Sequence, residues 1–227
     1  MTHRKTLAPA AVALAALLLA VGARAQMPAD TPSRLESEPD GWVDVMPTRD
    51  LSGWTRQPWP ISAKAGPQQW RLDEAAGTLV CDGTGGHDWL RLDRELGDGV
   101  FHVEWRFVPL AADDAKYNAG VLVRTAPDQS VWHQAQVGDE RSGFLFGRTP
   151  VDGTVQRVNL SAHLATFRVR APGEWNVYEV TAKGPKISLW VNGAVTSEMT
   201  VSVLRGHFGL EGEGYRIEFR NLKLKTL

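Results

Sequence analysis

The chain has 227 residues, with 25 Lys and Arg against 26 Asp and Glu and a formal net charge of −1. This balance argues against a nucleic-acid partner, because binding nucleic acid requires a concentrated basic face. Cys81 is the only cysteine, which excludes an intrachain disulfide and a zinc site built on a cysteine cluster. The length suffices for one sizeable domain.

The N-terminus has the features of a cleaved export signal. Three basic residues at positions 3–5 precede an almost unbroken Ala/Leu/Val stretch over residues 7–22, and Ala23-Arg24-Ala25 forms a small-x-small cleavage site before Gln26. The apolar stretch is short for a membrane span, and no other segment approaches the roughly 20 residues that a spanning helix needs. We expect residues 1–25 to be removed and the protein to be periplasmic or extracellular, without a membrane span.

Residues 26–40 are rich in Pro, Ser, Asp and Glu and predict a flexible lead-in. From Gly41 to Leu227 the sequence predicts short strands separated by Gly, Pro, Asn and Asp, and apolar residues nowhere recur at helical spacing for three turns. The expected strands cover residues 42–46, 69–72, 78–82, 89–92, 100–108, 120–125, 131–137, 143–148, 154–158, 166–169, 176–183, 186–191, 195–199, 206–211 and 215–224. This pattern predicts an all-β protein with one β-sandwich domain.

Two features near the C-terminus predict local geometry. Asn192-Gly193 follows an alternating strand and is the strongest short-range signal for a type I′ hairpin turn. In the last strand, alternation of apolar and polar residues slips at Arg220-Asn221, which predicts a β-bulge or a strand end.

Nine tryptophans are many for this length. Trp132, on a polar predicted strand, and Trp59, in the loop Gln57-Pro58-Trp59-Pro60, are the best candidates for stacking on a sugar ring. For five further tryptophans the context favours a structural role, in which the indole fills the layer between two sheets. These are Trp54, Trp70, Trp105, Trp175 and Trp190.

Eight short motifs follow one another along the chain. They are D-L-S-G-W at 50–54, the stretch from Trp70 through Val80, E-W-R at 104–106, N-A-G-V at 118–121 with Arg124, Q-A-Q-V-G-D at 134–139, G-E-W-N at 173–176, N-G at 192–193 and F-R-N at 219–221. In this order they resemble the motifs of the exported 3-keto-disaccharide hydrolase family. Each motif is weak alone, but together they cover essentially all of residues 41–227.

The resemblance implies a concanavalin A-like jelly-roll fold, which agrees with the strand pattern. It also implies cleavage of a glycoside that carries a ketone at C3 of the sugar. The ketone acidifies the proton on C2, so a base can remove it, the glycosidic oxygen leaves from C1, and water adds afterwards. Such a site needs a general base and donors for the enolate oxygen, and we expect no cofactor.

Strand parity selects candidate site residues. Trp132, Gln134 and Gln136 share one face of their strand and predict the lining of a wet groove. Asn118 and Asp139, at strand edges, are further candidates for substrate binding. Three residues are catalytic candidates: Glu104 on a face that could meet the groove, Arg124 as an oxyanion contact or an ion-pair partner of Glu104, and Glu211 as the base.

One position departs from the family pattern: Gln134 stands where the family usually carries Glu. An amide cannot act as a base, so either another group serves or the protein binds sugar without cleaving it. If the family's base belongs at this position, Gln134→Glu should raise turnover. No histidine stands at metal-ligand spacing, so no metal site is predicted.

Overall fold

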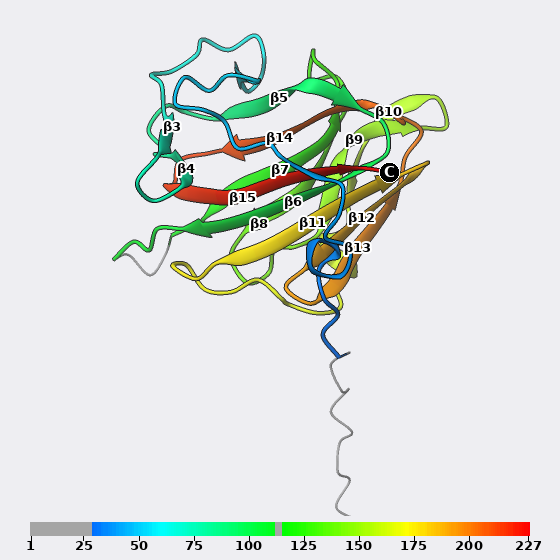
Figure 1. Cartoon of the computed structure of the whole chain (residues 1–227). Coiled ribbons are helices and arrows are strands. Elements are labelled where there is room, and N and C mark those ends of the chain that lie inside the picture. Colours follow the sequence, from blue (N-terminus) through cyan, green and yellow to red (C-terminus); the bar gives the residue numbers. More distant parts are fainter. Residues whose placement is uncertain (1–28, 112–114) are drawn as a thin grey trace, which may run out of the picture.

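Two antiparallel β-sheets packed face to face form the protein (Figure 1). The computed structural model describes residues 29–111 and 115–227, so the predicted signal peptide lies outside the described residues. The eight-stranded sheet contains, in spatial order, β13 (Ala194–Thr200), β12 (Lys186–Val191), β11 (Asn176–Lys183), β6 (Gly99–Phe107), β15 (Ile217–Thr226), β4 (Thr78–Cys81) and β3 (Trp70–Asp73), with β1 (Trp42–Asp44) also paired to β15.

The seven-stranded sheet carries the candidate site. Its spatial order is β10 (Thr154–Asn159), β9 (Leu145–Val151), β8 (Trp132–Gly138), β7 (Asn118–Thr125), β14 (Gly206–Gly212), β5 (Asp88–Leu96) and β2 (Trp54–Pro58). Two short helical elements, α1 (Arg34–Ser37) and the 3₁₀ turn η1 (Ser161–His163), complete the described chain. The prediction of an all-β sandwich with a concanavalin A-like fold is confirmed.

Alternation along the strands builds the core between the sheets. In β6, Phe101, Val103, Trp105 and Phe107 are buried in the core, as the sequence predicts. Because successive strand side chains point to opposite faces, the intervening residues of β6 lie on the outer face of the eight-stranded sheet. The same rule gives the seven-stranded sheet an outer face of its own, on which the cavity described below is found.

Two local predictions at the C-terminus are confirmed. Asn192 and Gly193 have φ values of 40° and 109°, the positive values that a type I′ turn requires. The pairing of β15 with β6 shifts between Arg220 and Lys223, and Asn221 has φ 50°, so a bulge occurs where the alternation slips.

Two strand predictions are wrong. Residues 166–169 form no strand; instead the Arg168 carbonyl accepts from Asn192 Nδ2 (2.7 Å) and the Arg170 amide donates to Asn176 Oδ1 (2.8 Å). Conversely, residues 54–58 form β2, where the sequence predicts no strand and assigns residues 57–60 to a loop. This strand lies at the sheet edge, where a proline is tolerated because no neighbour needs its amide.

The described part of the lead-in forms α1 and contacts the eight-stranded sheet. Ser33 is the N-cap of α1, and the Arg34 and Leu35 amides donate to the Glu179 carboxylate on β11 at 2.6 and 2.9 Å. Glu179 also pairs with His102 Nδ1 at 2.9 Å, and both side chains are buried. A buried carboxylate therefore attaches this segment to the outer face of the eight-stranded sheet, which composition alone could not reveal.

Replacing Glu179 with alanine should lower the free energy of unfolding by about 2–4 kcal/mol, because a buried imidazole and two helix amides lose their acceptor. Urea denaturation measures this loss. Glu198→Ala is the control, since its pair with Lys186 is exposed and such pairs contribute about 0–1 kcal/mol. Equal stability of the two variants would contradict the anchoring role of Glu179.

Among the described residues, no helix has the length and apolar character required to cross a membrane.

Candidate active site

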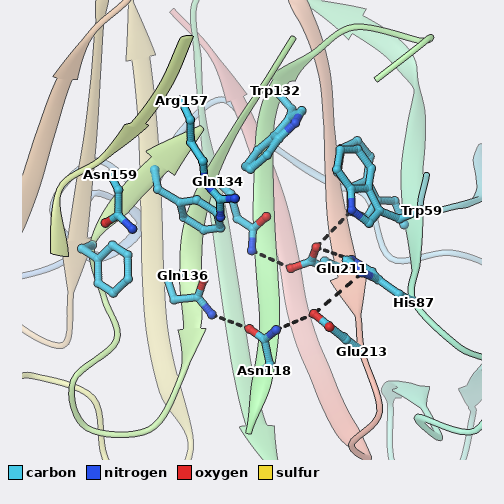
Figure 2. Close-up of a pocket in the computed structure, with 13 residues that line it drawn as sticks. Trp59, His87, Asn118, Trp132, Gln134, Gln136, Arg157, Asn159, Glu211 and Glu213 are labelled. Atoms are coloured by element: carbon cyan, nitrogen blue, oxygen red, sulfur yellow. Dashed lines mark hydrogen bonds and ion pairs between the residues drawn. The ribbon is translucent and has the colours of Figure 1, made fainter. Parts of the chain in front are cut away.

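A cavity of about 340 Å³ opens on the outer face of the seven-stranded sheet (Figure 2). Its residues come from five neighbouring strands (β5, β7, β8, β9 and β14), from the edge strand β10 and from the segments beside them. They are Trp59, His87, Trp89, Asn118, Trp132, Gln134, Gln136, Phe144, Phe146, Arg157, Asn159, Glu211 and Glu213.

Aromatic rings form one wall of the cavity. Trp59 stacks on Trp89 with ring centroids 4.4 Å apart, and Trp132 meets Trp59 edge-on at 5.6 Å. Leu122, on β7, packs with Trp89 and Trp132 beneath this wall. Rings arranged at a polar cavity suit the C–H faces of a sugar.

Glu211 is the centre of the polar floor. It lies on β14 between Trp89 of β5 and Gly120 of β7, and the residue is 5% exposed. Trp89 Nε1 (3.1 Å) and His87 Nε2 (2.6 Å) lie against its Oε1, while Gln134 Nε2 donates to its Oε2 at 2.5 Å. An ionised carboxylate only accepts, so the hydrogen between His87 and Glu211 belongs to His87 Nε2.

A missing side chain permits the contact between Gln134 and Glu211. A Cβ built on Gly120 would lie 2.2 Å from Gln134 Nε2, so any other residue there would push this amide away. Gly120 therefore leaves the space through which Gln134 reaches across β7 to β14.

A second chain of hydrogen-bonded side chains lies beside the Gln134–Glu211–His87 contacts. Gln136 Nε2 donates to Asn118 Oδ1 at 2.6 Å, and Asn118 Nδ2 donates to Glu213 Oε2 (Figure 2). Glu213 Oε2 also lies 3.8 Å from His87 Nδ1, which is too far for a hydrogen bond. The imidazole thus stands between two carboxylates, bonded to one of them.

This position determines the electrostatics of His87. Burial by itself lowers its pKa, but the hydrogen bond with Glu211 and the charges of Glu211, Glu213 and Asp88 raise the pKa above the ordinary value of 6.5. Ligand atoms of His87, Glu211 and Glu213 lie within 4.8 Å of one another, the spacing of a group that could hold a metal ion. In this structure the negative charges of Glu211 and Glu213 act on the His87 imidazole and favour its protonated form.

The structure brings five of the sequence-predicted residues together: Asn118, Trp132, Gln134, Gln136 and Glu211. Parity selected the three residues on β8, since Ala135 and Val137 point into the core. Trp59, the other predicted sugar-stacking residue, also lines the cavity.

Arg124 does not lie in this groove, contrary to prediction. Between Gly209 and His207, β14 advances two residues while β7 advances three, from Leu122 to Thr125, and Arg124 has φ 48°. This bulge ends the simple alternation of β7. The guanidinium is fully buried, donating to the Gly184 carbonyl at 2.6 Å and pairing with Asp98 at 2.9 Å.

Glu104 and Asp139 also lie outside the cavity. Glu104 is on the outer face of the other sheet, where it pairs with Arg220 at 2.7 Å and accepts from Asn221 at 2.9 Å. Its ion-pair partner is therefore Arg220, not Arg124. Asp139 is exposed in the turn after β8, where its carboxylate accepts from the Arg141 amide at 2.9 Å. Parity assigns a residue to one face of its own sheet but cannot say which sheet the strand joins.

Sequence reasoning missed several cavity residues, above all His87 and Glu213. His87 follows the glycine-rich run Gly83-Thr84-Gly85-Gly86, and Glu213 is two residues after Glu211, in a corner between strands. A signal existed for Glu213, because equal parity with Glu211 suggests a shared face. No sequence signal pointed to His87, because its hydrogen-bond partner Glu211 is 124 positions away in the chain.

Comparison with known proteins identifies the family. The profile of the 3-keto-alpha-glucoside-1,2-lyase-like domain matches residues 41–225. The chain belongs to this family. This match supports a carbohydrate-active function.

Solved structures share the fold at low identity. Among them is a Parabacteroides distasonis protein provisionally named a glycosyl hydrolase, with a TM-score of 0.57 and 16% identity over 88% of this chain and 99% of that one. Another is the carbohydrate-binding module CBM66 from Bacillus subtilis, with a TM-score of 0.54 and 11% identity over 80% of this chain and all of that one. No curated protein sequence matches the chain.

Proposed function

We propose that this protein cleaves glycosides that carry a ketone at C3 of the sugar, and that it does so after export. The reaction is removal of the C2 proton, expulsion of the glycosidic oxygen from C1, and addition of water to the resulting enone. The net change is hydrolysis: one water is consumed, and a 3-keto sugar and an alcohol are released. Family membership supports this substrate class, and the cavity contains the groups that the chemistry needs.

His87 is the proton acceptor in this proposal. Its Nε2 hydrogen is directed at Glu211, while its Nδ1 has no hydrogen bond among the described residues. An imidazole that a carboxylate orients through one nitrogen has the other nitrogen available as a base. This hydrogen bond of 2.6 Å is the observation that carries the proposal.

Glu211, the base expected from sequence, receives a different role. Donors already occupy both of its oxygens, namely His87 and Trp89 at Oε1 and Gln134 at Oε2. We assign it the orientation of His87 and the stabilisation of the imidazolium that forms. The amides of Gln134, Gln136 and Asn159 are placed to contact sugar hydroxyls.

The direct test incubates the protein with 3-keto-trehalose and 3-keto-sucrose, with the unoxidised sugars as controls, and follows the products by NMR. Exchange of the C2 proton for deuterium in D₂O, before or during cleavage, would report the enolisation step itself. Absence of both exchange and cleavage would refute the proposal.

A non-catalytic carbohydrate-binding function is the second candidate. The aromatic wall around Trp59 and Trp132 favours it, because such a wall holds a sugar without any chemistry. Calorimetric binding of unoxidised disaccharides, with no turnover of the 3-keto forms, would select this function.

Gln134→Glu separates two positions for the base. With His87 as the base, the new carboxylate would lie against Glu211 in place of a donor, and two carboxylates at this distance must share a proton. We expect turnover to fall by about tenfold, because orientation of His87 weakens. Turnover of a 3-keto-glycoside that rises instead would place the base at position 134, as the family pattern suggests.

A further inference from the structure

Two arginines lie opposite each other beside the cavity. The register of the seven-stranded sheet places Arg148 of β9 next to Trp132 of β8, and Arg157 of β10 next to Arg148. Directly paired residues of neighbouring antiparallel strands point to the same face, so both arginines share the face on which Trp132 lines the cavity. Both side chains are exposed.

Such a pair is unfavourable unless something compensates it, because like charges directly opposite each other repel. Among residues 29–111 and 115–227, neither arginine forms an ion pair with a carboxylate. The Arg157 guanidinium carbon lies over the Phe146 ring, 5.8 Å from the ring centroid. Two guanidinium groups therefore lie on this face without an ion pair, and that of Arg157 lines the cavity.

Acidic and basic side chains therefore lie on opposite sides of the cavity. His87, Glu211 and Glu213 occupy one side, while Arg157 extends from β10 over Phe146 on the opposite side (Figure 2). The proton-transfer groups would engage the oxidised sugar at the first side. The part of the glycoside that leaves would then extend toward the arginines.

We propose that Arg157, supported by Arg148, binds an oxyanion substituent on the leaving part of the glycoside, so that acidic glycosides are preferred to neutral ones. Guanidinium groups bind carboxylates and phosphates through paired, charge-assisted hydrogen bonds, and an anion would relieve the repulsion between the two side chains. The inference rests on the proposed function, since it requires that the cavity hold a glycoside.

The test measures binding of matched unoxidised ligands by calorimetry, so it does not depend on turnover. Cellobiose is compared with cellobiouronic acid for a carboxylate, and trehalose with trehalose 6-phosphate for a phosphate. Wild-type protein should bind at least one acidic ligand about tenfold more tightly than its neutral counterpart, a ratio that added salt should reduce. The pair that shows the larger ratio identifies the oxyanion.

Arg157→Ala should abolish this preference. Arg148→Ala should reduce it while leaving affinity for the neutral ligands nearly unchanged, because Arg148 does not line the cavity. Arg141→Ala is the matched control, because Arg141 is an exposed arginine that does not line the cavity. Equal affinity for acidic and neutral ligands, or no binding of either, would overturn the inference. The arginines would then serve only to keep the sheet edge at β10 from pairing with another chain. Failure of the proposed function is a separate result: acidic ligands would still bind more tightly, but no 3-keto-glycoside would be cleaved.

Discussion

Replacing His87 with alanine should lower kcat on a 3-keto-glycoside by about 10²–10⁴-fold, the usual contribution of a general base. The imidazole is the cavity group that combines a fixed orientation, through Glu211, with a ring nitrogen that makes no hydrogen bond to the described residues. KM should change much less, because the aromatic wall and the amides remain to bind the sugar. Steady-state kinetics and deuterium exchange at C2 should both show the loss.

His163→Ala is the matched control, since His163 is an exposed histidine of η1 that does not line the cavity. Full activity of His87→Ala together with an inactive Glu211→Gln variant would reassign the base to Glu211. Wild-type-like rates in both variants would exclude this cavity side as the catalytic centre.

The pH profile of kcat/KM should show an acidic limb above pH 6.5 that Glu211→Gln moves to lower pH. His87 accepts a proton only when neutral, so the rate should be low below its pKa and rise as pH increases through it. In the wild type, the Glu211 hydrogen bond and the nearby carboxylates keep this pKa above 6.5. Glutamine at 211 removes the negative charge and leaves at most a neutral acceptor for the imidazolium. Burial, which lowers the pKa of His87, is then less opposed, so the pKa falls.

The plateau rate of Glu211→Gln should also fall, by about tenfold or more, because the carboxylate no longer stabilises the imidazolium. Glu213→Gln provides the comparison: its carboxylate is 3.8 Å from Nδ1 without a hydrogen bond, so its shift of the limb should be smaller. Profiles recorded with and without a chelator test whether a metal ion at the three-residue group contributes. An acidic limb that stays in place in Glu211→Gln would disprove the role of His87.

Both outcomes bear on the difference between an enzyme and a binding module. The aromatic wall serves either function, whereas a His87 pKa held above its ordinary value by Glu211 bears on proton transfer and not on stacking against a sugar ring. Deuterium exchange at C2 is therefore more informative than affinity for deciding between them.

Local sequence determined most of the fold. Asn192-Gly193 predicts its turn, the slip at Arg220-Asn221 predicts a bulge, and the alternation in β6 predicts which residues fill the core. These features depend on neighbouring residues in the chain, which is why they can be read without coordinates. The polar face of β8 likewise revealed three of the cavity residues, Trp132, Gln134 and Gln136.

Tertiary structure alone decided the rest of the site, because the partners are far apart in the chain. His87 and Glu211 meet across 124 positions, only after β5 and β14 pair. Arg124 leaves the groove because a bulge in β7 interrupts strand parity, and Glu104 leaves it because β6 belongs to the other sheet. Parity is a property of one strand, whereas the composition of a cavity depends on which strands become neighbours and where their register shifts.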